Sequence, residues 1–175
     1  MKQGDFFPIQ QKAYGGELLK TRRGRMHGRT LSTKHSMHLV LRSTRAKGAL
    51  SFLRHRITID RILTKFAAKN GVRILSLANV GNHLHLEIRL STRHTYRAFI
   101  RAITAAIAMA VQGKNRWNKI QEKFWDYRPF TRIVVGYRAL LSLKDYIEIN
   151  QLEGLGVARS KSRLALGWRV VRPPG

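Results

Sequence analysis

Two histidines, His83 and His85, stand on either side of one leucine in the stretch NVGNHLHLEIRL (79–90). Imidazole nitrogens bind several divalent metals, so two imidazoles held side by side can form half of a metal site. If the stretch is a β-strand, both imidazoles project from one face, whereas Leu84 and Leu86 point from the other face into the core. Taken alone, such a pair is more often structural, and a metal site needs a further ligand from another element.

The other half of such a site is found in a helical pattern late in the chain, RALLSLKDYIEINQLEG (138–154). Tyr146 and Asn150 are four residues apart, so they lie on one side of a helix. Leu143 and Ile147 share that side and can pack it against the sheet. The amide oxygen of Asn150 could complete a His-His-Asn site with the phenol of Tyr146 beside it. The helical pattern alone equally allows a tyrosine at the edge of the core and an asparagine that bonds near the helix end.

Hydrophobic periodicity and turn residues divide the chain into short elements that can position these groups. In the first helix, apolar residues at 50, 53, 57, 62, 63 and 66 follow a helical rhythm, which Asn70-Gly71 ends. Two strands meet at Gly81, where the pattern predicts a hairpin. In chain order we expect a strand at 36–43, a helix at 48–71, strands at 72–80 and 82–90, a helix from 91 to 113, a strand at 131–136 and a helix at 138–154 that Gly154 terminates.

The order β-α-β-β-α-β-α indicates an α+β protein. We expect a small antiparallel or mixed sheet in a ferredoxin-like arrangement, with the helices on one face. These elements form one folded domain, residues 36–157. A basic N-terminal arm (1–35), rich in Lys, Arg and Gly, precedes the domain, and a basic C-terminal tail (158–175) follows it.

The charge of the chain points to a polyanionic partner. The 175 residues are 43% hydrophobic, enough for a core, and carry a formal charge of +25 from 34 Lys and Arg against 9 Asp and Glu. Nucleic acid is the leading partner and an anionic membrane surface the lesser one. The absence of cysteine excludes disulfides, thiolate zinc sites and cysteine nucleophiles. The longest apolar run (102–111) is too short to span a bilayer, so we expect a soluble intracellular protein and no membrane partner.

Arginines in three places are candidates for contacts with DNA phosphates. The stretch FWDYRPF (124–130) interleaves aromatic residues with Arg128, a composition that can stack bases and hold phosphates. Phe124 and Trp125 are better explained as core residues. The candidates are Arg22, Arg23 and Arg25 in the arm, Arg116 and Arg128 before the last expected strand, and Arg132 within it.

The motifs NHLH (82–85) and DYIEIN (145–150) resemble those of the single-tyrosine transposases with a His-hydrophobic-His motif, and most closely the REP-associated tyrosine transposases. SMHLVLR (36–42) and FWDYRPFTRIV (124–134) are also similar to that family's first strand and to the region before its last helix. The resemblance covers residues 34–157. It has three departures: Gly81 and Gln151 stand where the family often has proline, and Glu87 is not a family feature.

By this resemblance, His83 and His85 are metal ligands, Asn150 is the third ligand and Tyr146 is the nucleophile. The family cleaves and rejoins single-stranded DNA, often beside a hairpin, through a 5′-phosphotyrosine link, and it uses Mg²⁺ or Mn²⁺. The resemblance therefore implies a metal-dependent DNA transposase with endonuclease activity. We expect it in the bacterial cytoplasm with the nucleoid, as a monomer or a homodimer.

Other functions remain open from the residues alone. A catalytically inactive relative that only binds structured nucleic acid would carry the same charge. A basic RNA-binding α+β protein of ribosomal type would too, and it would bind no metal. A two-histidine phosphodiesterase would have Ser or Thr two residues after each histidine, but Glu87 follows His85, so this class is excluded.

The remaining tyrosines and histidines are weaker candidates for the site. Tyr96 follows the histidine strand, but residue 100 is Ile, so Tyr96 has no amide four residues later. His38 alternates within the first strand and could face the same site, although we assign it a structural role. The tyrosines in connections or in the arm are Tyr14, Tyr127 and Tyr137. The histidines interpreted as surface residues are His27, His35, His55 and His94.

Overall fold

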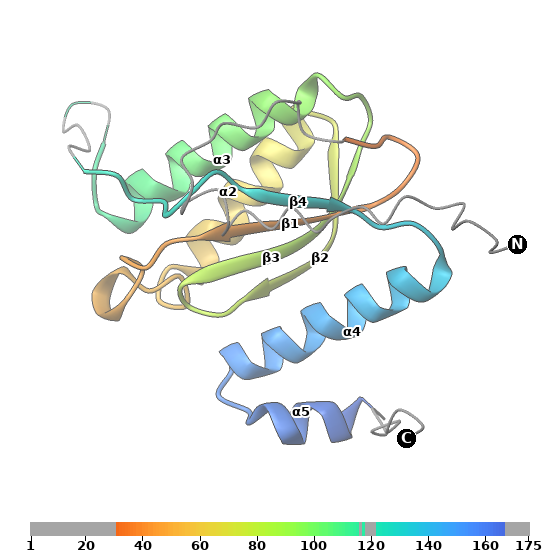
Figure 1. The fold of residues 1–175 in the computed structure, drawn as a ribbon. Coiled ribbons are helices and arrows are strands. Elements are labelled where there is room, and N and C mark those ends of the chain that lie inside the picture. The colour runs from red at the N-terminus through yellow and green to blue at the C-terminus, as the bar shows by residue number, and fades with distance from the viewer. Residues whose placement is uncertain (1–30, 116, 118–121, 167–175) are drawn as a thin grey trace, which may run out of the picture.

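A four-stranded antiparallel sheet with strand order β2-β3-β1-β4 forms the centre of the protein (Figure 1). The structure is a computed structural model that describes residues 31–115, 117 and 122–166. The elements are β1 (Met37–Arg42), the 3-10 turn η1 (Gly48–Leu50), α2 (Arg56–Lys69), β2 (Val72–Asn79), β3 (His83–Leu90), α3 (Thr95–Val111), β4 (Phe130–Ile133), α4 (Tyr137–Gly154) and α5 (Arg159–Ala165). The predicted α+β class and ferredoxin-like order are confirmed, and the sheet is antiparallel throughout.

The helices cover both faces of the sheet, so the expectation that they share one face is correct only for α2 and α3 (Figure 1). The main core lies between those two helices and the strand residues that point toward them, among them Leu39, Leu84 and Leu86. Helix α4 packs on the opposite face, against β2 and β3. Strand β3 alternates apolar and polar side chains, and its apolar side chains pack beneath α2 and α3. The polar side chains of His85 and Glu87 on the opposite face are buried as well, where α4 packs on the sheet.

The first helix begins later than the apolar rhythm predicts. Phe52 is fully buried. Its backbone nitrogen donates to Gly81 O at 2.7 Å, and its carbonyl accepts from Nδ2 of Asn79 at 2.8 Å. These bonds tie the segment before α2 to the β2–β3 turn and exclude helical bonding there. The buried stripe of α2 consists of Ile59, Leu63 and Ala67. The end predicted at Asn70-Gly71 is confirmed.

The hairpin between β2 and β3 is confirmed, and the register of β3 against β1 determines which side chains share a face. Gly81 has φ +92°, a conformation that L side chains rarely adopt, and its nitrogen donates to Oδ1 of Asn79 at 3.1 Å. Across the β1–β3 pair, His83 lies opposite Arg42, and Glu87 lies opposite His38.

The last strand and the helix after it are close to their predicted positions. Strand β4 ends at Ile133 rather than at residue 136, and Gly136, with φ +88°, turns the chain into α4. Helix α4 continues past Gln151 to Gly154, which a proline at 151 would not favour. In the stretch interpreted as a basic tail, residues 159–165 form the short helix α5, which the sequence did not predict.

Gly154 was predicted to terminate α4, but the structure explains this glycine by a close contact with the sheet. It lies within the helix, and a Cβ built on it would be 2.2 Å from the backbone oxygen of Asn79 at the end of β2. The absence of a side chain therefore allows α4 to approach the sheet closely. The residue with positive φ after the helix is Gly156. No helix in the described ranges is both long and apolar enough to cross a membrane.

We expect Gly154→Ala to destabilise the protein by about 1–3 kcal/mol, because the new methyl meets backbone that no rotamer change can move aside. This cost exceeds the gain of about 1 kcal/mol that alanine brings over glycine in a helix. Urea denaturation measures the difference. Gln151→Ala, an exposed change in the same helix, is the matched control. A Gly154→Ala protein as stable as the parent would contradict the close approach.

Candidate active site between the sheet and helix α4

The two histidines of β3 lie side by side on the face that α4 covers. The ring centroids of His83 and His85 are 4.7 Å apart. His85 is deeply buried, with 4% of its surface exposed, whereas His83 is half-buried. The Nε2 atom of His85 is buried and has no hydrogen-bond partner. The predicted side-by-side projection is confirmed, and it leaves one buried ring nitrogen available to a ligand.

A third histidine, His38 of β1, contacts the pair from the neighbouring strand. Its Nε2 is 3.1 Å from Nδ1 of His85, and the two rings stack with centroids 5.4 Å apart. The sequence favours a structural role for His38, although its alternation allows it to face the same site. The alternation of MHLVLR places His38 and Arg42 on the face opposite Met37 and Leu39, so the strand pattern contained the signal, but only the strand register shows the contact.

The phenol predicted to act with the histidines also reaches them. The ring of Tyr146 on α4 meets His85 edge-on, with centroids 5.2 Å apart and an interplanar angle of 88°. It meets His38 in the same way at 5.8 Å. Tyr146 is 36% exposed, so the residue is partly open to solvent. Leu143 and Ile147, predicted to anchor this side of the helix, are buried against Ala78 and Val134.

Asn150 is buried one turn after Tyr146. Its Nδ2 donates to the backbone oxygen of Tyr146 at 2.6 Å. The bond uses the amide nitrogen, so the carbonyl oxygen of the side chain remains as the atom that can bind a cation.

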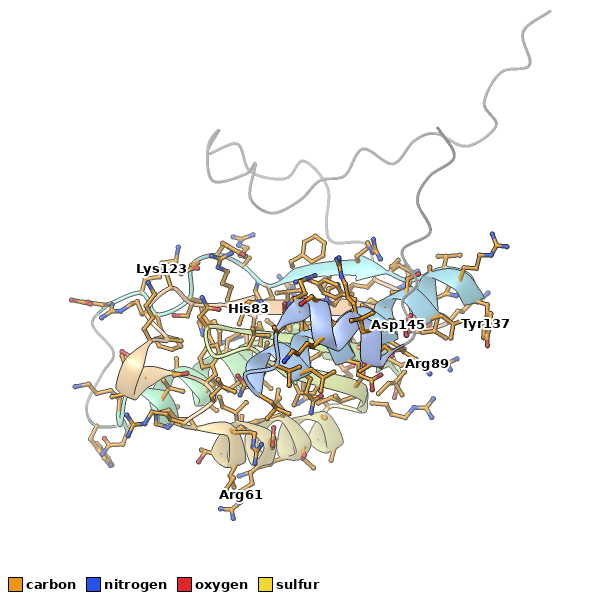
Figure 2. The ribbon with its side chains drawn as sticks, turned by 90° about the horizontal axis from the view of Figure 1, so that it is seen from below. Arg61, His83, Arg89, Lys123, Tyr137 and Asp145 are labelled. Carbon is orange, nitrogen blue, oxygen red and sulfur yellow. The ribbon has the colours of Figure 1, made fainter. Side chains whose placement is uncertain are left out.

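The other described tyrosines are placed elsewhere. Tyr96 is buried in the main core on the α2–α3 side of the sheet. Tyr137 is 75% exposed at the first turn of α4, and Figure 2 shows it far from His83. Tyr127 lies in the connection before β4, and Tyr14 lies outside the described residues. Among the described tyrosines, Tyr146 is therefore the one that meets the histidines.

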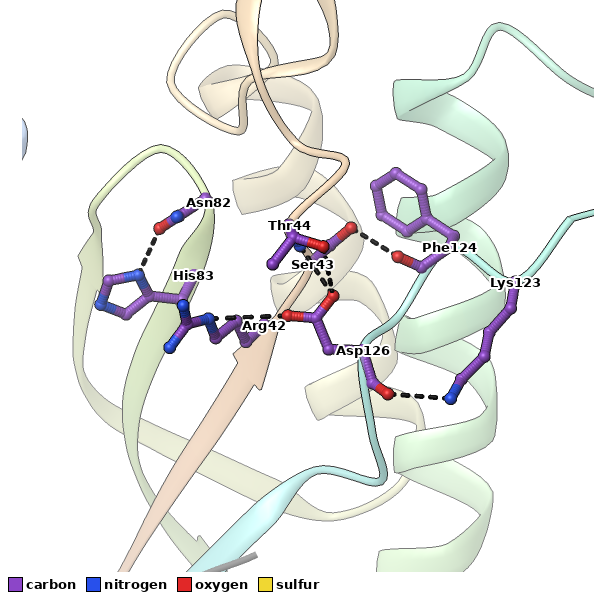
Figure 3. Close-up of polar contacts among 8 residues, drawn as sticks. All are labelled: Arg42, Ser43, Thr44, Asn82, His83, Lys123, Phe124 and Asp126. Carbon is purple, nitrogen blue, oxygen red and sulfur yellow. Dashed lines mark hydrogen bonds and ion pairs between the residues drawn. The ribbon is translucent and has the colours of Figure 1, made fainter. Parts of the chain in front are cut away.

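A cluster of polar contacts lies at the end of β1, next to His83 (Figure 3). The Oδ1 atom of Asp126 accepts from Thr44, from its backbone nitrogen at 2.8 Å and its hydroxyl at 2.9 Å. The other oxygen of Asp126 is 3.5 Å from Nε of Arg42. Beside Arg42, Oδ1 of Asn82 accepts from Nδ1 of His83 at 2.5 Å, which leaves the Nε2 lone pair of His83 free to bind a ligand. The sequence analysis did not single out Arg42 or Asn82.

Comparison with protein families identifies the chain. The model of IS200-like transposases matches residues 31–150, more than half of the sequence. The chain belongs to the IS200-like transposase family. This membership confirms the resemblance seen in the NHLH and DYIEIN motifs, and it makes the protein a DNA transposase by family.

A solved structure of a transposase shares the fold of this protein. A REP-associated tyrosine transposase bound to a REP hairpin is 14% identical, with a TM-score of 0.62, over 87% of this chain and 92% of the other. A putative transposase from Deinococcus radiodurans is 20% identical over 74% of this chain and 96% of the other, with a TM-score of 0.41. Comparison with curated proteins gave no match.

Burial keeps the three histidines of the transposase uncharged. It lowers the pKa of His85 to about 3, with a further contribution from the charge of His83. Burial and then the charge of Arg132 lower the pKa of His38 to about 4. Burial and the charge of Arg42 also lower the pKa of His83. At neutral pH the imidazoles are neutral, so their lone pairs are available to a metal ion.

A divalent cation fits the donors that the site presents. The described part of the chain contains no group of three or more His, Cys, Asp or Glu side chains able to hold a metal ion. The predicted donors, which would hold such a cation, are the imidazoles of His83 and His85 and the amide oxygen of Asn150. The unpartnered Nε2 of His85 agrees with such a use.

The predicted DNA-contacting arginines divide into two groups. Arg132 is exposed on β4 and lies opposite His38 in the sheet register, and Arg128 is exposed just before that strand. Arg22, Arg23, Arg25 and Arg116 lie outside the described residues. Phe124 is buried and Trp125 packs against the main core, as predicted for both.

The histidine cluster should make the free energy of unfolding depend on pH. Between about pH 6.5 and the lowered pKa values, the unfolded chain binds protons that the folded protein excludes. Stability is therefore complete above about pH 6.5 and falls as the pH decreases toward 4. Urea denaturation without added metal, from about pH 7 to about pH 4.5, should show a loss of at least 2 kcal/mol, because each pKa unit corresponds to about 1.4 kcal/mol.

His85→Gln removes one of the groups responsible, so the decline of stability with acid should become shallower. His94→Gln changes an exposed imidazole and serves as the control, with the slope of the parent. If the slope of His85→Gln equals that of the parent, burial of His85 does not govern the acid sensitivity.

Proposed function

We propose that this transposase cleaves and rejoins single-stranded DNA beside a hairpin, through a 5′-phosphotyrosine intermediate on Tyr146 and with a divalent cation. One observation carries the proposal: the ring of Tyr146 meets His85 at 5.2 Å, on the side of the sheet where Nε2 of His85 has no partner. Nucleophile and cation ligand are then close enough to act on one phosphodiester.

The reaction is a transesterification at phosphorus. The hydroxyl oxygen of Tyr146 forms a bond to the scissile phosphorus, and the bond from phosphorus to the 3′ oxygen breaks. The 3′ oxygen takes up a proton from solvent and leaves as a 3′ hydroxyl. The phenolic proton passes to solvent. In the reverse direction, a 3′ hydroxyl attacks the phosphotyrosine and the strand is joined again. The energy of the phosphodiester is conserved in the link, so no nucleotide cofactor is needed.

His83, His85 and Asn150 are the residues that would hold the cation. When bound, Mg²⁺ or Mn²⁺ polarises the scissile phosphate and neutralises the charge that develops on the leaving oxygen. Imidazole ligands favour manganese over magnesium, which prefers oxygen. Burial keeps His85 uncharged, and Asn82 holds the ring of His83 in the tautomer with a free Nε2.

The DNA strand meets a basic surface next to the site. Arg42 stands beside His83 (Figure 3). Arg132 on β4 lies opposite His38 on β1. The similar REP-associated transposase was solved with a hairpin, which supports a hairpin-bearing strand as the partner. We extend the binding surface to Arg128, to Arg116 and to the arm residues Arg22, Arg23 and Arg25. Such a protein works in the bacterial cytoplasm, with the nucleoid, as a monomer or a homodimer.

Tyr146→Phe should abolish a covalent protein–DNA adduct while leaving DNA binding within about threefold of the parent, because only the nucleophilic oxygen is removed. The assay incubates the protein with labelled hairpin-bearing single strands and Mn²⁺ and resolves the adduct on a denaturing gel. Tyr137→Phe, at the first turn of α4, is the matched control and should form the adduct. EDTA should prevent it in every variant.

Two results would reject this mechanism. An adduct formed by Tyr146→Phe would assign the nucleophile to another residue. Tight binding by the parent without any adduct, across several hairpins and both metals, would identify a relative that only binds structured nucleic acid.

Arg132→Ala should weaken binding to single-stranded DNA several-fold and reduce the slope of log affinity against log salt by about 0.7, because one phosphate contact is lost. Arg61→Ala removes the same charge from α2, on the far side of the sheet from α4 (Figure 2), and is the control. Fluorescence anisotropy at several salt concentrations measures both. Equal losses in the two variants would mean that total charge, rather than this surface, determines binding.

A further inference from the structure

We propose that His38 is a positioning residue that fixes the ring of His85, so that the Nε2 lone pair of His85 is directed at the cation. The inference deepens the proposed function and rests on it. His38 would bind neither cation nor DNA itself. It would act through the hydrogen bond between its Nε2 and Nδ1 of His85.

The hydrogen bond selects one tautomer of His85. The 3.1 Å separation between the two nitrogens places one proton between them. The Nε2 atom of His85 is buried and has no partner. A proton on Nε2 would be a buried donor without an acceptor, which costs about 1–3 kcal/mol. The proton of His85 therefore resides on Nδ1, and it is donated to His38.

This arrangement is the one that a histidine ligand of a metal requires. A ligating imidazole binds through one nitrogen and donates from the other to a fixed acceptor, which sets both tautomer and ring orientation. The acceptor is usually a carboxylate, a backbone carbonyl or water, and here it is a neutral imidazole. His38 then carries its own proton on Nδ1. Asn82 accepts a hydrogen bond from Nδ1 of His83 in the same way, so each histidine of the pair has its own acceptor.

His38 itself is held firmly. It lies in β1, which pairs with β3 on one side and β4 on the other, and it is buried. The ring of Phe130 meets it edge-on, with centroids 6.2 Å apart. Its acceptor nitrogen is therefore positioned by the sheet.

The same ring also touches the nucleophile. Tyr146 meets His38 edge-on at 5.8 Å, so His38 supports both the cation ligand and the phenol from the sheet side. A substitution at position 38 should therefore change the affinity of the DNA-free protein for the cation. Substitution of a residue that only contacts DNA would leave that affinity unchanged.

Two variants separate the hydrogen bond from packing. His38→Gln keeps an acceptor, because its amide oxygen reaches about as far as Nε2 of histidine, whereas His38→Leu has a similar volume and no acceptor. We expect His38→Leu to lower the affinity of the DNA-free protein for Mn²⁺ by about 10–100-fold and His38→Gln by no more than about threefold. Phe130→Leu alters the packing around His38 without removing a hydrogen bond, and is the control. Electron paramagnetic resonance of free Mn²⁺ measures the affinities.

Nitrogen-15 NMR of the imidazoles gives a readout besides metal binding. The parent and His38→Gln should show His85 protonated on Nδ1, and His38→Leu should show a mixture of tautomers. Parent-like affinity in His38→Leu, or equal weakening in His38→Gln and His38→Leu, would overturn the inference while adduct formation by the parent still upheld the proposed function. A parent that binds no Mn²⁺ and forms no adduct would overturn both.

Discussion

The structure depends on the alternation of side chains along β3, which is buried on both faces. Leu84, Leu86 and Ile88 fill the core beneath α2 and α3, whereas His85 and Glu87 point the other way and are also removed from solvent. Buried polar groups are costly unless they find partners. The second face satisfies its polar groups only in part. His85 bonds to His38 and Ser76 donates to Glu87, whereas Nε2 of His85 and Oε1 of Glu87 are buried without a hydrogen-bond partner among the described residues. Burial in this layer keeps the imidazoles neutral, and a cation ligand has to be neutral imidazole.

Helix α4 closes that face with a small apolar contact rather than with a second large core. Leu143 and Ile147 pack on Ala78 and Val134, and Gly154 lets the end of the helix approach the backbone of β2. The position of Tyr146 over His85 consequently depends on contacts beside it in the middle of α4 and at the end of that helix, made by residues that take no part in the chemistry. A displacement of about 1 Å matters for such a reaction, so packing at Gly154 and geometry at Tyr146 are coupled.

Features that arise within one element could be predicted from the sequence. The pairing of His83 with His85 follows from strand alternation, and that of Tyr146 with Asn150 from the helical repeat. Features that depend on how separate helices and strands pack together could not be predicted from the sequence. The contact of His38 requires the register of β1 against β3, and the late start of α2 follows from bonds between Phe52 and the β2–β3 turn. The expectation that all helices share one face is wrong for α4 for the same reason, since the periodicity of a helix does not say which face of a sheet it covers.

Burial also determines from which side a phosphate reaches the site. His38 and His85 lie deep under α4, whereas His83 is half-buried and Tyr146 and Arg42 are more open to solvent. Under the proposed function, a DNA strand would approach over His83 and Arg42, at the end of β1 where Asp126 contacts Arg42 and Thr44. In that proposal the buried His38 orients the cation ligand His85, and the more exposed His83, Tyr146 and Arg42 lie where a large substrate would make contact.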